Sequence, residues 1–434
     1  MYFFYNIAIH LFAFALWFAS FWNSKAKSMV RGRMHWKRKM RENLPAKNNV
    51  RYWFHCASLG EFEMARPVIE QLQIEFPECE IIVTFFSPSG YEQRQHFLCT
   101  GVYYLPYDTA KNTRKWFEIV QPDVAVFVKY EFWLNFMKAG LEAGCQMTAI
   151  SVLLREGQFF FEPWAAEWKT QLLQFKRIFV QNTSSDLVGK EEGLQNIVVA
   201  GDIRYDRVLD TVEHAEDLPV IEAFKGENNL LIGGSTWKEE EEFLFEYLSI
   251  KSWPLGWKWV IAPHDIGQNH IQFIQDLFSD YYPVTYSNWN ASETKNKHKI
   301  LIIDNIGLLA RIYKYGAAAL IGGGWGKGLH NILEPAAFGL PVLFGPKHQK
   351  FPEAQEAIDA GFASSAKDYN EFERHLNRMI GNTEWRLEAS QKAKDFVKKN
   401  SGSADVVLEY FRQNHKAEMP PKPKEQEPFK ETLF

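Results

Sequence analysis

The sequence has few cysteines and little net charge. Its four cysteines, Cys56, Cys79, Cys99 and Cys145, are scattered over 434 residues. They lack the close spacing of zinc sites and of secreted disulfide frameworks, so we interpret them as reduced thiols in a cytosolic compartment. The formal net charge of −4 excludes the broad positive field that nucleic-acid-binding proteins usually carry. We therefore expect no nucleic-acid partner, and any charge signal must be local.

Acidic residues are absent from the first 41 positions. Residues 2–22 carry no formal charge, and such a helix is about as long as the hydrocarbon core of a bilayer is thick. The basic residues that follow it before Glu42 are Lys25, Lys27, Arg31, Arg33, Lys37, Arg38, Lys39 and Arg41. By the positive-inside tendency, this asymmetry places the rest of the chain in the cytoplasm. We predict a membrane anchor over 1–23 and a basic juxtamembrane segment over 24–47.

Two other interpretations of the N-terminus compete with a spanning helix. A cleaved signal peptide is disfavoured, because positive charge before the apolar run and a small-residue cleavage site after it are both missing. A helix that lies in the membrane interface stays open, since Asn6 and His10 lower the hydrophobicity of the segment. In either case the basic run would meet anionic lipid phosphates, at about 1 kcal/mol per cation. A lipid is therefore a candidate substrate.

The remaining chain is too long for one hydrophobic core and predicts two α/β domains. From residue 50 onward, short apolar runs alternate with amphipathic stretches, which is typical of βαβ units over a parallel sheet. The expected strands are 51–56, 80–84, 101–105, 124–128, 146–152, 177–180 and 197–200, and then 230–233, 258–261, 283–286, 300–303, 317–321 and 341–344.

We interpret this alternation as two Rossmann-like, doubly wound lobes facing a cleft. The first covers 48–215 and the second 216–413, with a linker around 212–228. The Pro-, Lys- and Glu-rich segment 414–434 is expected to be disordered. Because open parallel sheets bind ligands at the carboxyl ends of their strands, functional residues are expected just after strands.

The segment after the first strand contains Ser58 and Glu61 before a helical pattern. This spacing fits a capping box, in which Glu61 would reach back to the Ser58 amide. It also fits a general base, a carboxylate at the sheet edge that takes the proton from a hydroxyl of the acceptor substrate. Gly60 would let a ligand approach the backbone closely. The two interpretations do not exclude each other.

The densest glycine segment follows the strand 317–321 and precedes a helical pattern that begins at Asn331, with Glu334 three residues later. Backbone amides exposed there would favour an anionic group such as a phosphate, and Glu334 could clamp a ribose diol. The pattern is neither a Walker loop nor a dinucleotide fingerprint. A tight turn with a capping box is the structural alternative.

Four further segments that follow predicted strands contain candidate residues. Glu131 comes after 124–128 beside aromatic residues, and Arg204 occurs in the turn after 197–200. A solvated helix start and an ion pair with Asp202 or Asp206 are their plain alternatives. Thr236 and Glu239 are spaced as a helix cap. His264 follows a central strand and is either a structural histidine or a nucleotide contact.

Taken in order, these segments resemble the 3-deoxy-D-manno-octulosonic acid (Kdo) transferases, from the N-terminal anchor to about residue 400. The matching stretches are ASLGEFE, SPSGYE, YLPYD, YEFW, ISVLLRE, GDIRYD, GGSTWKEEE, APH, IDNIG and GLHNILEPAAFGLPVLFGP. The resemblance implies a GT-B fold, an inner-membrane anchor, CMP-Kdo as the donor and the lipid A precursor as the acceptor.

Carried over position by position, the resemblance implies that Glu61 is the general base and that Glu131 and Arg204 assist the transition state. The donor contacts it implies are Pro263, His264, Ile306, Gly307, Leu308, Asn331, Ile332, Leu333 and Glu334. The chain departs from the family pattern at Pro263, where Arg is common, and at Leu308, where an acidic residue is common. Arg204 replaces a lysine and keeps its charge.

The function we predict is an inverting transfer of Kdo to a lipid acceptor at the inner membrane. No Asp-x-Asp pair follows a predicted strand, which disfavours the metal-dependent GT-A chemistry, so we expect no metal and no cofactor. Two alternatives stay open. One is another GT-B glycosyltransferase that uses a UDP-sugar on a membrane lipid. The other is a membrane-tethered protein that binds a nucleotide sugar without transferring it.

Overall fold

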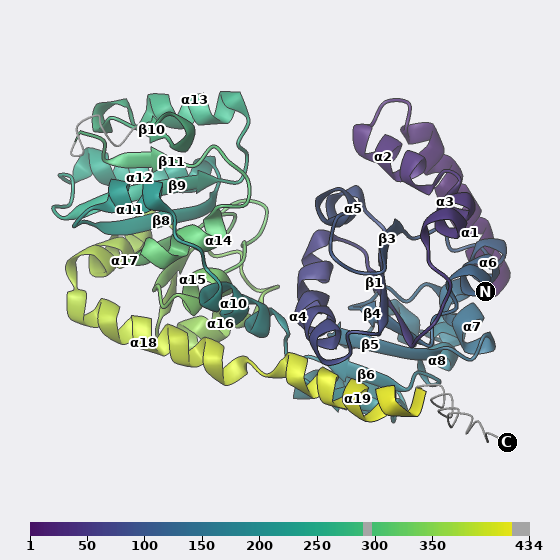
Figure 1. Cartoon of the computed structure of the whole chain (residues 1–434). Coiled ribbons are helices and arrows are strands. Elements are labelled where there is room, and N and C mark those ends of the chain that lie inside the picture. The colour runs from purple at the N-terminus through teal and green to yellow at the C-terminus, as the bar shows by residue number, and fades with distance from the viewer. Residues whose placement is uncertain (290–296, 419–434) are drawn as a thin grey trace, which may run out of the picture. The chain divides into compact units, whose positions relative to one another are not determined.

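The computed structural model describes residues 1–289 and 297–418. They form two compact units, the first from Met1–Arg207 together with the segment that begins at Gly402, and the second from Val208–Ser401. In Figure 1 the first unit contains α1 to α9 and α19, and the second contains α11 to α18. Each unit is built on its own seven-stranded sheet.

The sheet of the first unit has the strand order β3-β2-β1-β4-β5-β6-β7, and its strands pair in parallel. The strands are β1 (Arg51–Cys56), β2 (Glu80–Phe85), β3 (Gly101–Tyr104), β4 (Val124–Val128), β5 (Gln146–Val152), β6 (Arg177–Val180) and β7 (Ile197–Val199). The order reverses between β1 and β4, so the carboxyl ends of these two strands flank the topological switch point where ligands bind in such sheets.

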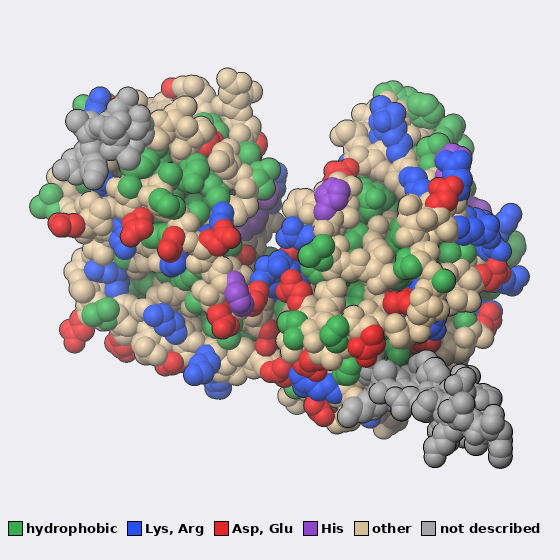
Figure 2. Space-filling model, viewed as in Figure 1, with side chains coloured by type: hydrophobic (Ala, Val, Ile, Leu, Met, Phe, Trp, Pro, Cys, Tyr) green, Lys and Arg blue, Asp and Glu red, His purple; other side chains and the backbone are tan. Residues whose placement is uncertain are grey.

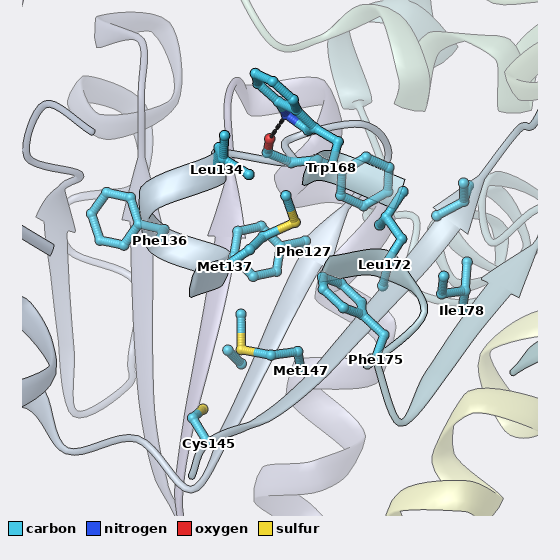
Figure 3. Close-up of a cluster of buried hydrophobic side chains, with 14 of the residues drawn as sticks. Phe127, Leu134, Phe136, Met137, Cys145, Met147, Trp168, Leu172, Phe175 and Ile178 are labelled. Carbon is cyan, nitrogen blue, oxygen red and sulfur yellow. Dashed lines mark hydrogen bonds between the residues drawn. The ribbon is translucent and has the colours of Figure 1, made fainter. Parts of the chain in front are cut away.

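Helices cover both faces of this sheet (Figure 1). They are α4 (Leu59–Glu75), α5 (Pro88–Arg94), α6 (Ala110–Val120), α7 (Leu134–Glu142), α8 (Ala166–Leu172) and α9 (Thr183–Glu191). Because side chains alternate along a strand, Trp53 joins one core cluster while Tyr52 and Phe54 join the other. Figure 3 shows part of the Trp53 cluster, where the Trp168 indole N–H donates to the Phe132 carbonyl at 2.9 Å.

All four cysteines have free thiols, and Cys56 and Cys145 are buried. Cys145 lies within the cluster of Figure 3, next to Met147. These thiols therefore serve as small apolar core residues, as expected from their scattered spacing.

The sheet of the second unit has the strand order β10-β11-β9-β8-β12-β13-β14 and is also parallel. Its strands are β8 (Asn229–Thr236), β9 (Trp257–Pro263), β10 (Val284–Thr285), β11 (Ile300–Ile302), β12 (Ala318–Ile321), β13 (Val342–Phe344) and β14 (Ala363–Ser365). Its helices are α11 (Pro219–Lys225), α12 (Lys238–Ile250), α13 (Gln268–Leu277), α14 (Leu309–Ile312), α15 (Leu333–Ala337), α16 (Pro352–Asp359), α17 (Tyr369–Gly381) and α18 (Thr383–Asn400). Two doubly wound lobes are thus present, as predicted.

The limits of the units differ from the expected domains 48–215 and 216–413 at both ends. The division falls after Arg207, within α10 (Arg204–Glu213), and α19 (Ser403–Glu418) belongs to the first unit. The apolar face of α19 joins the core of the first unit through Ala404, Val407, Leu408 and Phe411. Of the expected disordered tail 414–434, residues 414–418 belong to α19, and 419–434 lie outside the described residues.

The N-terminal segment forms α1 (Tyr2–Ala19), α2 (Ser24–Arg33) and α3 (Trp36–Asn43). Within the described part of the chain, α1 is the one helix that is long and apolar enough to cross a membrane. One residue departs from the prediction that the whole basic run meets lipid phosphates, and that residue is Arg33. It is buried, and its guanidinium donates to the carbonyls of Met29, Leu105 and Phe86 at 3.0, 2.8 and 2.7 Å. Arg33 is therefore a structural residue rather than a surface cation.

Candidate active site

Two carboxylates, Glu61 and Glu131, come together at the carboxyl ends of β1 and β4. Glu61 lies in the first turn of α4, which begins directly after β1, and Glu131 follows β4. Both are half-buried. His55, near the end of β1, is close to both: its Nε2 is 3.5 Å from Glu131 Oε2, and its charge acts on Glu61. The parallel register of β1 and β4 pairs His55 with Phe127 and so brings these loops to one edge.

The backbone contact of Glu61 differs from the expected capping box. Ser58 is the N-cap of α4, but its side chain makes no capping hydrogen bond. The Glu61 carboxylate instead accepts the N–H of Ala57, one residue earlier than expected. The contact fixes the carboxylate at the strand end, because Ala57 directly follows β1.

The environment of Glu61 makes it more basic than an ordinary glutamate. Burial raises the pKa of Glu61, and the nearby charge of Glu131 raises it further, while the Ala57 N–H, His55 and Lys129 act in the opposite direction. The net result is a raised pKa. A half-buried carboxylate of raised pKa at a sheet edge is typical of residues that take up a proton during a reaction.

Glu131 is held by aromatic and histidine neighbours. Its Oε2 accepts the indole N–H of Trp133 at 2.9 Å. His55 is fully buried, with Nδ1 3.0 Å from Thr84 Oγ1, and its Nε2 has no hydrogen-bond partner within the described residues. A buried ring nitrogen directed toward a carboxylate at 3.5 Å can form a closer contact after a small movement or through a water molecule.

Sequence reasoning did not single out His55 or Lys129. Lys129 adopts a left-handed backbone conformation, with φ of 60°, directly after β4. This conformation is strained for a residue with a side chain, and such strain gathers at functional sites. The sequence did contain a signal for His55: it is a titratable residue at the end of a central strand, as His264 is.

Arg204 is paired with Asp202, as its plain alternative predicted. Its Nε and Nη2 donate to Asp202 Oδ2 at 2.8 and 2.6 Å, and its own N–H donates to Asp202 Oδ1 at 3.0 Å. Asp206 has a different role, since it accepts the N–H groups of Gly402 and Ser403 at 2.7 and 3.1 Å. The pair leaves the Arg204 side chain 29% exposed, so it still presents positive charge to solvent.

The second unit has a cavity of about 320 Å³ at the carboxyl ends of β8 and β12. It brings together three of the predicted donor contacts, Gly307, Asn331 and Glu334, although they are far apart in sequence. The other residues that line it are Gly234, Ser235, Leu309, Ala310, Tyr313, Ile321 and His330. Ile306 and Leu308 flank Gly307, and Ile306 is 82% exposed. Ile332 and Leu333 are buried beneath this region.

His264 is part of an aromatic stack. Its ring stacks on Trp237 and on His330, with centroid distances of 4.6 and 4.7 Å. The Trp237 indole N–H donates to His330 Nε2 at 3.1 Å, and burial, followed by the charge of His264, lowers the pKa of His330. Because His330 also lines the cavity, the stack connects His264 to it. Pro263 ends β9 in the core beneath His264.

Packing constrains the glycine segment after β12, and some of its amides are not available for the predicted phosphate contact. A Cβ on Gly322 would lie 2.1 Å from the Ser235 carbonyl oxygen, and one on Gly324 would lie 2.5 Å from the Gly345 nitrogen. The amides of Gly322, Gly326 and Gly328 donate to backbone carbonyls, and that of Gly323 donates to Glu240. These four N–H groups are therefore already used within the protein.

The expected helix caps are also shifted. α15 has Ile332 as its N-cap and is five residues long. Asn331 Oδ1 accepts the Leu333 N–H at 3.0 Å, and Asn331 Nδ2 donates to Glu334 Oε1 at 3.1 Å. The Glu334 carboxylate is thus oriented by a side chain instead of capping a helix.

At the start of α12, the N-cap is Trp237 instead of Thr236. The carboxylate that accepts its N–H is Glu240, at 2.8 Å, instead of Glu239. Burial raises the pKa of Glu240 to about 7.

Comparison with known proteins finds similarity to one family of transferases. A family model described as 3-Deoxy-D-manno-octulosonic-acid transferase (kdotransferase) matches residues 30–207. The 3-deoxy-D-manno-octulosonic acid transferase of Chlamydophila psittaci is 24% identical over 380 residues, covering 83% of this chain and 84% of that protein. The Haemophilus influenzae protein of the same name is 23% identical over 381 residues, covering 83% and 86%. The chain is a glycosyltransferase homologous to the Kdo transferases.

The architecture of this glycosyltransferase has solved counterparts. The UDP-GlcNAc 2-epimerase of Neisseria meningitidis, bound to UDP-GlcNAc, matches with a TM-score of 0.61 at 16% identity. The match covers 85% of this chain and 100% of that chain. At this identity the likeness shows the fold alone, and it confirms the predicted GT-B class.

The matched family region contains Glu61, Glu131 and Arg204, and the alignments with the two relatives extend over most of the chain. The roles of these residues in the glycosyltransferase stay predictions. Within residues 1–289 and 297–418, no group of three or more His, Cys, Asp or Glu side chains is placed to hold a metal ion. The prediction of a metal-independent reaction is untested.

Proposed function

We propose that this glycosyltransferase transfers Kdo from CMP-Kdo to the lipid A precursor, with inversion of configuration and with Glu61 as the general base. The observation that carries the proposal is the environment of Glu61, a half-buried carboxylate at the end of β1 whose pKa is raised by burial and by Glu131. Such a carboxylate is a stronger base than a surface glutamate, which favours removal of a proton from a sugar hydroxyl.

The proposed reaction is a single displacement. The proton of a primary hydroxyl on the acceptor moves to Glu61 as the hydroxyl oxygen bonds to the anomeric carbon of Kdo. The bond from that carbon to the phosphate oxygen breaks, and CMP leaves from the opposite face with the bonding electrons. One carboxylate suffices, because a phosphate leaves with little need of protonation. No metal or cofactor takes part in this proposal.

The donor is assigned to the cavity of the second unit. In this proposal Glu334 accepts hydrogen bonds from ribose hydroxyls, which its orientation by Asn331 supports, and the stack on His264 offers an aromatic surface near the cavity. Arg204 supplies positive charge for the leaving phosphate, and Asp202 holds its guanidinium in place. The glycine amides that already have acceptors are not assigned to phosphate binding.

The membrane side of the proposal is attachment at the cytoplasmic face of the inner membrane. It is supported by the length and apolar composition of α1 and by the cations that follow it in α2 and α3. An enzyme that modifies a lipid-borne sugar must reach the membrane surface, and this sequence of elements brings the first unit there.

The test is direct transfer. Membranes that contain the protein are incubated with CMP-Kdo and a tetraacylated lipid A precursor, and the product mass is measured. We expect a mass increase of one or more Kdo residues. Transfer from a UDP-sugar instead would show a different GT-B enzyme. Binding of CMP without transfer to any acceptor would show a nucleotide-sugar binding protein and contradict the proposal.

A further inference from the structure

The helix α1 packs on the first unit along one face. Its covered side chains are spaced by three or four residues, as one face of a helix requires. They are Tyr2, Tyr5, Asn6, Ile9, Ala13, Leu16 and Ser20, and Ile9 is only 7% exposed. The contacts of this stripe with the body of the unit are concentrated in the first half of α1.

The beginning of α1 is hydrogen-bonded to the body of the unit. The Tyr2 hydroxyl donates to Asn135 Oδ1 at 2.6 Å, and Asn135 Nδ2 donates to Asn6 Oδ1 at 3.1 Å. The Tyr5 hydroxyl donates to the buried Asp108 carboxylate, and its ring meets Trp168 edge-on at 5.0 Å. Asn135 belongs to α7, so these contacts hold the first residues of α1 against the folded domain.

Later residues of α1 contact the same unit. Phe12 stacks on Phe86 with a centroid distance of 6.1 Å, and Phe86 stacks on Trp133 at 5.1 Å. After α1, the chain turns into α2, whose buried Arg33 donates to the Phe86 carbonyl. The helix that α1 contacts most is α2, in the same unit.

These contacts are incompatible with a spanning helix. If the 18 residues of α1 crossed a bilayer, its first and last turns would lie about 27 Å apart, on opposite sides of the hydrocarbon core. Tyr2 and Asn6 would then be separated from Asn135 by the membrane. A helix whose first turns stay bound to the soluble domain that follows it in the chain must remain on the side of that domain.

The opposite face of α1 is apolar and uncovered. Phe3 and Phe4 are 70% and 66% exposed, and Leu11, Phe14 and Phe18 are 62%, 62% and 54% exposed. Exposed cations follow this face in α2 and α3: Lys25, Lys27, Arg31, Arg38, Lys39 and Arg41. In Figure 2, green and blue side chains gather on the part of the first unit where Figure 1 places α2 and α3. Aromatic residues beside cations are complementary to acyl chains beneath anionic phosphates.

We propose that α1 is a monotopic membrane helix, which lies in the plane of an anionic bilayer surface. The face of α1 that carries Phe3, Phe14 and Phe18 enters the lipid. The face that carries Tyr2 and Ile9 stays on the domain, and the cations of α2 and α3 contact lipid phosphates. The inference rests on the proposed function only for the presence of a membrane-borne acceptor. It replaces the single-pass anchor expected from the sequence.

The side of the membrane on which Met1 lies tests this proposal. A protease-cleavable tag is placed before Met1, which is 52% exposed, in the full-length protein. A second tag after Phe434 selects sealed vesicles in which that end faces the medium. We expect an impermeant protease to remove the Met1 tag without detergent. A tag that is cut only after detergent is added would show that α1 spans the membrane and would overturn the proposal.

A cross-link provides a second, independent readout. Asn6→Cys is combined with Asn135→Cys, because the two asparagine side chains are hydrogen-bonded. Cys79→Ala and Cys99→Ala remove the two native thiols that are not buried. We expect the disulfide to form in intact membranes, with the protein still bound to them. A control pair, Asn6→Cys with Lys176→Cys, should not cross-link. Lys176 directly precedes β6 and so lies at the amino ends of the parallel strands, whereas Asn135 lies beyond the carboxyl end of β4.

A cross-link that forms in detergent but not in membranes would show that α1 leaves the domain when it meets a bilayer. A pair that fails to cross-link in detergent as well as in membranes would contradict the contact of Asn6 with Asn135 and so overturn the proposal. Neither readout measures transfer, so failure of the monotopic helix and failure of the proposed reaction are distinguishable.

The partner is tested with vesicles of phosphatidylethanolamine, with or without phosphatidylglycerol. We expect phosphatidylglycerol to strengthen binding of the full-length protein. Lys25→Gln combined with Lys27→Gln should weaken that binding about thirty-fold at low salt. The control, Lys176→Gln with Lys190→Gln, should change it little. Binding that is indifferent to phosphatidylglycerol and to Lys25 and Lys27 would contradict the anionic surface as partner.

Discussion

Glu61 is the residue on which the proposed chemistry depends. Glu61→Gln removes the base but keeps an oxygen that can accept the Ala57 N–H, so the local fold should persist. We expect turnover to fall by about 10²- to 10⁴-fold with little change in CMP affinity. Glu70→Gln, in the same helix but paired with Arg66 at the surface, is the control and should retain activity. Comparable turnover in Glu61→Gln would remove the residue from this role.

The pH dependence of the reaction should report the coupling between the two carboxylates. Because the charge of Glu131 raises the pKa of Glu61, Glu131→Gln should lower that pKa. Glu61 would then stay ionised to lower pH, and the acidic limb of kcat/KM would move to lower pH even if the rate also falls. The measurement is the pH profile of kcat/KM for both proteins. An acidic limb that stays in place would separate Glu131 from the ionisation of the base.

At the scale of elements, Gly60 tests whether a ligand approaches the start of α4. A Cβ on Gly60 would meet no atom within 4 Å, and alanine favours a helix over glycine by about 0.5–1 kcal/mol. Gly60→Ala should therefore keep or raise the free energy of unfolding. If the acceptor passes close to this backbone, its KM should rise several-fold. Unchanged kinetics would show that glycine is not needed for ligand access.

Gly322 has the opposite expectation, because its position is closed. A Cβ there would lie 2.1 Å from the Ser235 carbonyl oxygen, and backbone cannot move aside cheaply. Gly322→Ala should lower the free energy of unfolding by about 1–3 kcal/mol. Chemical denaturation of the variant, with Gly60→Ala alongside, measures the contrast. A neutral result would restore ligand binding as the main reason for the glycine.

The strands of both sheets were largely predictable from sequence because they are buried on both faces and therefore read as apolar runs. The strand missed was β14, Ala363–Ser365, which has three small residues at a sheet edge and no apolar run. The caps of α12 and α15 were misplaced by one residue. Cap positions depend on which side chain reaches which amide. Glu240 also accepts the N–H of Gly323, a tertiary contact that sequence alone does not reveal.

At the scale of the whole molecule, α19 ties the end of the described chain to its first unit. Phe411 is 1% exposed in the core beside Tyr52. Phe411→Ala should destabilise the first unit by about 3–5 kcal/mol, because it leaves a cavity there. Val406→Ala, on the exposed side of the same helix, should cost little. Hydrogen exchange locates the effect: peptides from β1 and α4 should lose protection while peptides from β8 and β9 keep it. Loss confined to the second unit would contradict this assignment.

The sequence by itself determined the two parallel α/β domains, the apolar N-terminal helix and the positions of Glu61 and Glu131 after strands, because hydrophobic periodicity and strand ends are local properties. Only the tertiary structure decided that His55 lies near both carboxylates, that four of the glycine amides after β12 are already engaged, and that α1 and α19 pack on the first unit. These outcomes depend on contacts between residues far apart in the chain, where burial and hydrogen bonding select one partner among many that the sequence allows.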